Sequence, residues 1–197
     1  MTARGRFIVI EGGEGSGKST QARLLAEALA AVLTREPGAT EVGRRIRDLV
    51  LDPAAGALDD RAEALLMAAD RAQHVAEVVR PALDAGRDVV SDRFSGSTLA
   101  YQGYGRGLAL DELAWLNRWA ARGLEPDVVV LLDVPGDVTG ARMHGDPDRL
   151  EAEHSSFHDR VRDGYHALAA ADPARWVVVD GRGTVDEVAE RVLKAVR

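Results

Sequence analysis

A glycine-rich segment near the N-terminus has the residue types and spacing of a phosphate-binding loop. Residues 12–19 read Gly-Gly-Glu-Gly-Ser-Gly-Lys-Ser and fit the pattern G-x-x-x-x-G-K-S. Small residues let consecutive backbone N–H groups turn inward around an anion, and the N-terminus of a following helix adds positive potential. Lys18 can reach the β- and γ-phosphates of a nucleoside triphosphate, and the Ser19 hydroxyl can coordinate Mg²⁺. The pattern therefore predicts a site that binds a triphosphate and transfers its terminal phosphoryl group.

We expect the triphosphate and its metal ion to contact Gly12, Gly13, Glu14, Gly15, Ser16, Gly17, Lys18, Ser19 and Thr20. The alternative, a glycine-rich turn with a chance lysine, does not account for the match at every position of the pattern. Such a loop does not specify a reaction, because molecular switches, motors and kinases all use it. A GTP-dependent switch recognises guanine through an N-K-x-D motif. The single asparagine here, Asn117, is followed by Arg118 and Trp119, so the sequence disfavours a GTP switch.

Strands and helices alternate along the chain around this loop. Apolar runs at residues 6–10, 88–92, 127–133 and 176–180 are typical of buried parallel strands, and helical spacing follows the loop at Leu24, Leu25, Ala28 and Leu29. Further helices are expected over residues 59–85 (two helices, or one bent at Pro81), from Asp111 as cap to Gly123, over 150–171, and after a Thr184–Glu187 capping box. The pattern predicts one α/β domain over residues 1–197, built on a doubly wound parallel sheet with helices on both faces.

One connection does not fit this pattern easily. The strand-like residues 32–34 follow the first helix with almost no intervening chain. Either that helix ends early, or residues are missing from the chain between helix and strand.

Composition restricts the functional classes. The formal charge of −7 and pI near 5.3 disfavour a general nucleic-acid binder, which needs a broad basic surface. Lysine is used only at positions 18 and 194 among 25 cationic residues, and the absence of cysteine excludes thiolate chemistry. No apolar run approaches a membrane span, and the N-terminus leads directly into a strand-like segment. We therefore expect a cytoplasmic protein without nucleic-acid polymer or membrane as partner.

Two further groups of residues could bind an acceptor. Met67, Asp70, Arg71 and His74 share one face of a predicted helix, although a half-exposed helix with internal ion pairs would show the same spacing. Asp92 and Arg93 end a predicted buried strand, where ligands collect in open parallel sheets. A carboxylate there suits a metal ion and a guanidinium suits phosphate, although the two could also simply pair with each other.

Together these motifs resemble the bacterial thymidylate kinase family over nearly the whole chain. The resemblance is carried by residues 10–21 (IEGGEGSGKSTQ), 34–40 (TREPGAT), 68–74 (AADRAQH), 91–103 (SDRFSGSTLAYQG) and 148–151 (DRLE). It implies a P-loop NTPase-type fold with a mobile lid, ATP and Mg²⁺ as cofactors, and the phosphorylation of dTMP to dTDP. It also implies a homodimer.

The resemblance assigns roles by position. Ser19 and Asp92 would hold the metal ion, and Lys18 and Arg93 would be catalytic. The expected dTMP site consists of Glu14, Arg35, Glu36, Pro37, Met67, Arg71, Arg93, Ser97, Tyr101 and Gln102. Of these, Arg71 and Arg93 would hold the acceptor phosphate, and Tyr101 would favour a sugar without a 2′-hydroxyl.

The sequence departs from the family pattern at two places. Met67 stands where the family usually has a phenylalanine that stacks on thymine, and methionine lacks the aromatic face. The phosphate loop also lacks an arginine, which family members of this kind supply from the lid. The lid is expected at about residues 140–152, where Arg142 and Arg149 are the candidate catalytic residues; Arg149 is favoured by the Asp-Arg-x-Glu match.

The expected chemistry needs no general base, because the acceptor is already a phosphate anion and the obstacle is the approach of two anions. Lys18, Mg²⁺ and a lid arginine would neutralise the donor, while Arg93 and Arg71 would hold dTMP.

Two other functions remain open: a kinase for dUMP or a deoxynucleoside, and a regulatory module that binds ATP without chemistry. Trp115 and Trp119, one helical turn apart, fit either a dimer surface or, as is more usual at that spacing, the core.

Overall fold

The computed structural model describes residues 3–56, 58–135 and 147–197. Its sheet has five strands in the order β2-β3-β1-β4-β5, and all the pairs are parallel. The strands are β1 (Phe7–Glu11), β2 (Val32–Arg35), β3 (Val89–Asp92), β4 (Val128–Asp133) and β5 (Trp176–Asp180). The predicted doubly wound parallel sheet is confirmed, and each apolar run lies within about a residue of its strand.

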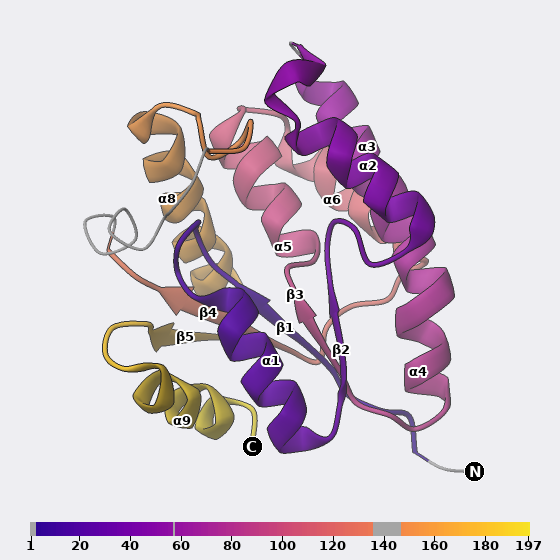
Figure 1. The fold of residues 1–197 in the computed structure, drawn as a ribbon, viewed down its shortest axis with the longest axis vertical. Helices are drawn as coiled ribbons and strands as arrows, with labels where there is room; N and C mark the ends of the chain where they lie inside the picture. Colours follow the sequence, from indigo (N-terminus) through magenta and orange to yellow (C-terminus); the bar gives the residue numbers. More distant parts are fainter. Residues whose placement is uncertain (1–2, 57, 136–146) are drawn as a thin grey trace.

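Both faces of the sheet are covered, as a parallel sheet requires. On one face, Ile8 and Ile10 pack against α1 (Lys18–Leu29) and α9 (Val185–Ala195), which lie side by side in Figure 1. On the other face, the alternate residues Phe7 and Val9 pack against η2 (Val75–Val79) and α4 (Arg80–Asp84). β1 therefore lies in the centre of the core, and its C-terminal end holds the phosphate loop.

The acceptor side is built from helices beyond the carboxyl ends of the strands. These are α2 (Glu41–Leu51), the short η1 (Pro53–Ala55), α3 (Asp60–His74), α5 (Ser95–Thr98), the π-helical η3 (Leu99–Gly105), α6 (Leu110–Ala120) and α8 (Ser155–Ala171). Tyr101 of η3 and Tyr165 of α8 belong to a third apolar cluster with Leu131 of β4. This cluster fixes the acceptor-side helices to the sheet.

Two predicted helix starts were wrong, whereas the helical stretch expected over residues 59–85 is confirmed. The helix expected from residue 150 begins at Ser155, because the Asp148 carboxylate accepts hydrogen bonds from the Leu150 and Glu151 N–H groups and holds them in a turn. Asp111 lies in the first turn of α6, and Ala109 occupies the cap position. Helical structure continues through residues 60–84, because Pro81 falls in the first turn of α4, where its missing N–H is tolerated.

The connection from α1 to β2 is short but complete. The helix continues to Leu29, and Ala30 then adopts the left-handed conformation with φ 50°. The Ala31 N–H donates to the Ala26 carbonyl at 2.9 Å, a bond typical of a helix that stops in one residue. Helix and strand are therefore joined without an early helix end, and the connection needs no additional residues.

Trp115 and Trp119 are exposed on α6, with 64% and 68% of their surface accessible, so of the two alternatives that the sequence left open, a place in the core is excluded. Their rings stack with centroids 6.3 Å apart and planes at 10°. Among the described residues, no helix is both long and apolar enough to cross a membrane.

Candidate active site

The phosphate loop connects β1 to α1 and is shaped by glycine. Gly12 has φ 151°, and a side chain there would place its Cβ 2.8 Å from the Leu132 carbonyl oxygen, so only glycine fits. Gly17 precedes α1 without any side-chain cap, which leaves the first N–H groups of the helix for an anion. Lys18 folds back over the loop, and its Nζ donates to the Gly13 carbonyl at 2.6 Å. Burial lowers the pKa of Lys18 to about 8, and nearby Arg93 acts in the same direction.

Ser19 and Asp92, the predicted metal ligands, are in contact. The Ser19 hydroxyl donates to Asp92 Oδ2 at 2.5 Å, and Asp92 Oδ1 is buried without a hydrogen-bond partner among the described residues. Hydroxyl and carboxylate oxygens suit Mg²⁺, which usually takes one or two protein ligands together with substrate phosphates. Accordingly, the described residues contain no cluster of three or more acidic, histidine or cysteine ligands. The donor set therefore fits Mg²⁺ bound together with a nucleotide.

Arg93 lies between the phosphate loop and the acceptor side. It is a non-glycine residue with φ 71°, a conformation that costs of order 1–3 kcal/mol and persists only where its surroundings hold it. Its Nη1 lies 3.1 Å from the Gly12 carbonyl, from Ser97 Oγ and from Tyr165 Oη. The guanidinium is thus fixed in orientation.

The other terminal nitrogen of Arg93 faces a carboxylate of the phosphate loop. Nη2 pairs with Glu14 and donates to Tyr101 Oη at 3.1 Å, while that hydroxyl donates to Glu14 at 2.8 Å. Burial alone would raise the pKa of Glu14, but the charges of Arg93 and Lys18 and the hydrogen bond from Tyr101 lower it to about 2. Glu14 is therefore negatively charged, and it shares the two hydrogens of Arg93 Nη2 with the Tyr101 hydroxyl.

Arg71 is buried in a network that crosses the acceptor side. Its Nε donates to Glu36 at 2.9 Å, and its terminal nitrogens reach Thr98, Asn117 and the Phe94 carbonyl. Glu36 also contacts His74 Nδ1 at 2.7 Å, and His74 Nε2 contacts Thr34 at 2.7 Å. The four residues predicted to share one face of α3 therefore have different surroundings. Met67, Asp70 and Arg71 line a pocket, whereas His74 is fully buried and contacts Glu36.

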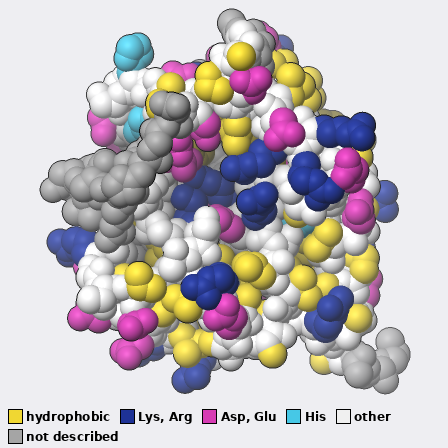
Figure 2. All heavy atoms as spheres, in the orientation of Figure 1, with side chains coloured by type: hydrophobic (Ala, Val, Ile, Leu, Met, Phe, Trp, Pro, Cys, Tyr) yellow, Lys and Arg dark blue, Asp and Glu magenta, His cyan; other side chains and the backbone are white. Residues whose placement is uncertain are grey.

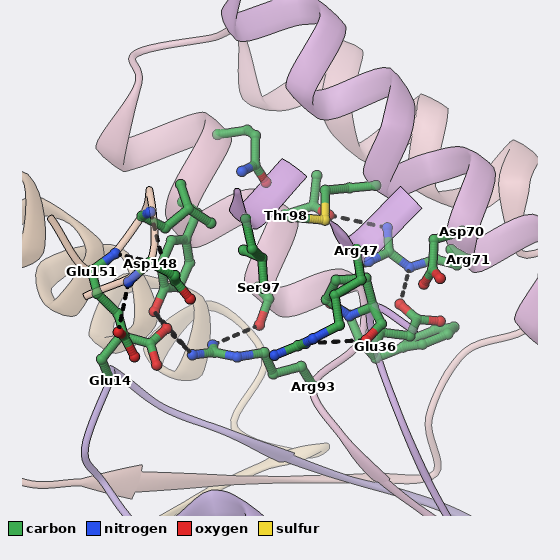
Figure 3. Close-up of a pocket in the computed structure, with 17 residues that line it drawn as sticks. Glu14, Glu36, Arg47, Asp70, Arg71, Arg93, Ser97, Thr98, Asp148 and Glu151 are labelled. Carbon is green, nitrogen blue, oxygen red and sulfur yellow. Dashed lines mark hydrogen bonds and ion pairs between the residues drawn. The ribbon is translucent and has the colours of Figure 1, made fainter. Parts of the chain in front are cut away.

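A pocket opens between the phosphate loop and α2, α3, α5 and η3. Figure 3 shows Glu14, Asp148 and Glu151 on one side of it, Glu36, Asp70 and Arg71 on the other, and Arg93 with Ser97 between them. Nine of the ten residues predicted for dTMP line this pocket: Glu14, Glu36, Pro37, Met67, Arg71, Arg93, Ser97, Tyr101 and Gln102. The tenth, Arg35, ends β2 beside the pocket but does not line it.

The two candidate lid arginines cannot be compared in this structure. Arg142 lies outside the described residues. Arg149 pairs with the fully buried Glu63, and its Nε donates to the Val50 carbonyl at 2.7 Å. In this conformation Arg149 therefore binds the acceptor-side helices α2 and α3, and a role at the donor phosphate would require it to leave Glu63.

Sequence reasoning missed Arg47 and Glu11. Arg47 lines the pocket from α2 and donates to the Pro37 carbonyl at 3.2 Å, and burial, together with nearby Arg35, lowers its pKa. Figure 2 shows basic side chains gathered around the hollow in this face of an otherwise acidic protein. In the sequence Arg47 is one of three arginines on an amphipathic helix, and nothing distinguishes it from Arg44 and Arg45. Glu11 carries a better signal, since it is a charged residue that directly ends an apolar strand at the phosphate loop.

A second hollow lies on the opposite side of the phosphate loop. Residues of α1 line it together with the connection from β5 to α9, including Gly183 and Thr184. Gln21 donates to the Val185 carbonyl at 3.0 Å, and its Oε1 is buried without a partner among the described residues.

The fold and site together define an α/β P-loop phosphotransferase, with a phosphate-binding loop after β1 and a pocket beyond Arg93. The family model described as thymidylate kinase matches residues 10–192. The chain therefore belongs to the thymidylate kinase family, whose members phosphorylate dTMP to dTDP with ATP and Mg²⁺, and this is its activity.

Individual relatives agree with this assignment. A protein named thymidylate kinase from Cutibacterium acnes is 50% identical over 98% of this chain and 96% of its own length. Another from Leifsonia xyli is 52% identical over 95% of this chain and 92% of its own. The crystal structure of thymidylate kinase from Ehrlichia chaffeensis superposes with a TM-score of 0.83 at 33% identity, covering 98% of this chain and 100% of the other.

Proposed function

We propose that ATP binds in the phosphate loop and dTMP in the pocket lined by Arg93, Arg47 and Met67, so that the two phosphates meet at Arg93. The position of Arg93 carries this proposal, because its guanidinium contacts the Gly12 carbonyl of the loop and also lines the pocket. A cation at that point reduces the repulsion between the two anions, which is the main barrier to phosphoryl transfer between them.

On the donor side, Lys18 and the first N–H groups of α1 would bind the β- and γ-phosphates. Ser19 and Asp92 would hold Mg²⁺, which when bound neutralises negative charge on the donor phosphates. A lid arginine, Arg142 or Arg149, would supply the cation that the phosphate loop lacks.

On the acceptor side, Arg93 and Arg47 would bind the phosphate of dTMP. Glu14 pairs with Arg93 here, and we propose that an entering phosphate replaces this carboxylate as the partner of Arg93. Met67, Tyr101 and Gln102 would contact the base and sugar. Arg71 was expected to hold the phosphate with Arg93, but all three of its nitrogens already donate to buried partners. We therefore propose that Arg71 lines the pocket and that Arg47 takes its place at the phosphate.

Substitution of Arg47 tests the acceptor assignment. Replacing Arg47 with Met should raise the KM for dTMP on the order of 10-fold or more and leave the KM for ATP within about twofold, because only the acceptor anion loses a charge partner. Arg44→Met on the same helix is the control, since Arg44 is exposed and pairs with Glu41. Equal KM values for dTMP in the two variants would remove Arg47 from the site.

We also propose a homodimer that forms through the exposed face of α6. Trp115, on which Trp119 stacks, shares a hollow with the exposed Leu65 of α3. The charged residues Arg61, Asp111 and Glu112 also line this hollow. Large exposed apolar groups with a charged rim are typical of protein interfaces.

A cytoplasmic location remains part of the proposal, because the reaction consumes ATP.

A further inference from the structure

We propose that Glu11 is a positioning residue that holds Arg93 in place through the hydroxyl groups of Ser97 and Tyr165 and through the backbone that follows Arg93. The proposal rests on the role proposed above for Arg93.

Glu11 is a buried carboxylate surrounded by hydrogen-bond donors. It ends β1 and has no accessible surface. Its Oε1 accepts from the N–H groups of Phe94 and Ser97, each at 3.0 Å. Its Oε2 accepts from Ser97 Oγ at 2.6 Å and from Tyr165 Oη at 3.0 Å. All four groups converge on one side chain that does not itself line the acceptor pocket.

The direction of these hydrogen bonds follows from the chemistry of arginine. A guanidinium has only donors, so Ser97 Oγ and Tyr165 Oη accept from Arg93 Nη1, each at 3.1 Å, and share its two hydrogens with the Gly12 carbonyl. Each hydroxyl then has its own hydrogen to donate, and Glu11 Oε2 lies within hydrogen-bond distance of both. Glu11 therefore turns the lone pairs of both hydroxyls toward Arg93.

Glu11 also holds the backbone at Arg93. The φ of 71° at Arg93 needs support on both sides. The Arg93 N–H donates to the Ile10 carbonyl at 2.9 Å, and the next N–H, of Phe94, donates to Glu11. Two consecutive residues of β1, Ile10 and Glu11, thus accept hydrogen bonds from the consecutive N–H groups of Arg93 and Phe94. The approach is close, since a Cβ at Gly96 would lie 2.8 Å from Glu11 Oε1.

The test compares Glu11→Gln, Arg93→Met and the double variant, with the Kd for dTMP measured without ATP. Glutamine keeps the size of the side chain but brings an NH₂ group against donors. We expect Glu11→Gln to raise the Kd for dTMP on the order of 10-fold and to leave the Kd for ATP within about twofold. In the Arg93→Met background the same change should have no further effect on dTMP binding, because Glu11 acts through Arg93.

Other outcomes would overturn one claim or the other. If Arg93→Met binds dTMP as the unsubstituted protein does, the proposed role of Arg93 fails. If Arg93→Met weakens dTMP binding but Glu11→Gln weakens it equally in both backgrounds, or weakens ATP as much as dTMP, Glu11 is only structural and the inference fails.

A second variant keeps the test valid if Glu11→Gln does not fold. Tyr165→Phe removes one hydroxyl and keeps the ring that packs beside Tyr101. It should weaken dTMP binding severalfold with Arg93 present and not at all with Arg93→Met. An equal loss in both backgrounds contradicts the proposal.

Discussion

At the scale of single residues, the site consists of charged groups whose orientation is fixed by buried partners. Arg71 and Arg93 each have partners at several of their nitrogens, and Arg71 and Glu36 are almost fully buried. Arginines held in orientation in this way need little reorganisation when a phosphate enters, since only the Glu14 carboxylate has to leave Arg93.

Asp70 should make stability depend on pH. Burial and the nearby negative Glu36 raise its pKa to about 6, and its Oδ2 has no partner among the described residues. The folded state therefore binds a proton that the unfolded state releases near its ordinary pKa of about 3.9. The stability that this proton contributes is present at low pH and is lost as the pH rises through about 6.

Asp70→Asn removes this titration and still offers an oxygen to the Gly38 N–H, which Asp70 Oδ1 now accepts at 2.9 Å. The free energy of unfolding in urea should be measured for both proteins. As the pH is raised from 5 to 8, the value for the variant should increase relative to that for the unsubstituted protein by on the order of 1 kcal/mol. Asp84→Asn, at an exposed position of α4, is the control. A pH-independent difference for Asp70→Asn would show that Asp70 does not titrate as described.

Residues of the phosphate loop could be predicted from the sequence because their partners are local. The loop folds on itself between one strand and one helix, so spacing alone brings Lys18 over Gly13. Arg47 and Glu11 could not be assigned in this way. Their partners come from α5, from α8 and from the residues that follow β2 and β3, and only the tertiary structure brings these together. The roles proposed for the individual residues, Arg142 and Arg149 included, remain predictions.

At the scale of elements, the acceptor pocket depends on the packing of α8 against η3. Tyr101 and Gln102 belong to η3, and Gly164 of α8 lies against the ring of Tyr104 in the same element. A Cβ at Gly164 would lie 2.6 Å from Tyr104 Cγ, so the two elements approach closely only because residue 164 has no side chain.

Gly164→Ala should therefore push η3 away from α8. Overpacking of this kind typically costs 1–3 kcal/mol, although alanine itself favours a helix. We expect a lower melting temperature and a higher KM for dTMP, measured by thermal unfolding and steady-state kinetics. Asp163→Ala, the adjacent exposed position, should change neither property. An unchanged melting temperature for Gly164→Ala would contradict the described contact.

The strands were more predictable than the helix boundaries. A parallel strand buried on both faces leaves a continuous apolar run, as in β4. Helix starts depend on local competition, as at Asp148, whose carboxylate holds residues 150 and 151 in a turn before α8. The turn after α1 uses alanine at a left-handed position where glycine is usual, so no sequence signal marks it.

At the scale of the whole molecule, the exposed tryptophans predict a dimer. Trp119→Glu should shift the protein from dimer to monomer, because a charge at the centre of an apolar interface is left unpaired. Sedimentation or light scattering at several concentrations measures this. Val185→Glu, at an exposed apolar position of α9, is the control and should leave the dimer intact. A monomeric unsubstituted protein would contradict the prediction.

All the described strands form one sheet, and the core clusters lie on its two faces and beneath the acceptor side. The single domain expected over residues 1–197 remains a prediction, as does the lid at about residues 140–152. Among the described residues, Arg93 contacts the phosphate loop and also lines the neighbouring pocket, which is the arrangement that the proposed donor and acceptor sites require.

The most direct test of this account is ADP release from Mg·ATP measured with a panel of acceptors: dTMP, dUMP, other monophosphates, and thymidine. We predict release that depends on the acceptor, with dTMP giving the highest kcat/KM and thymidine, which has no phosphate to receive the transfer, giving none. Lys18→Ala should lower this rate on the order of 10² to 10³-fold, whereas Lys194→Ala should not. ADP release that is the same with and without dTMP would contradict the account.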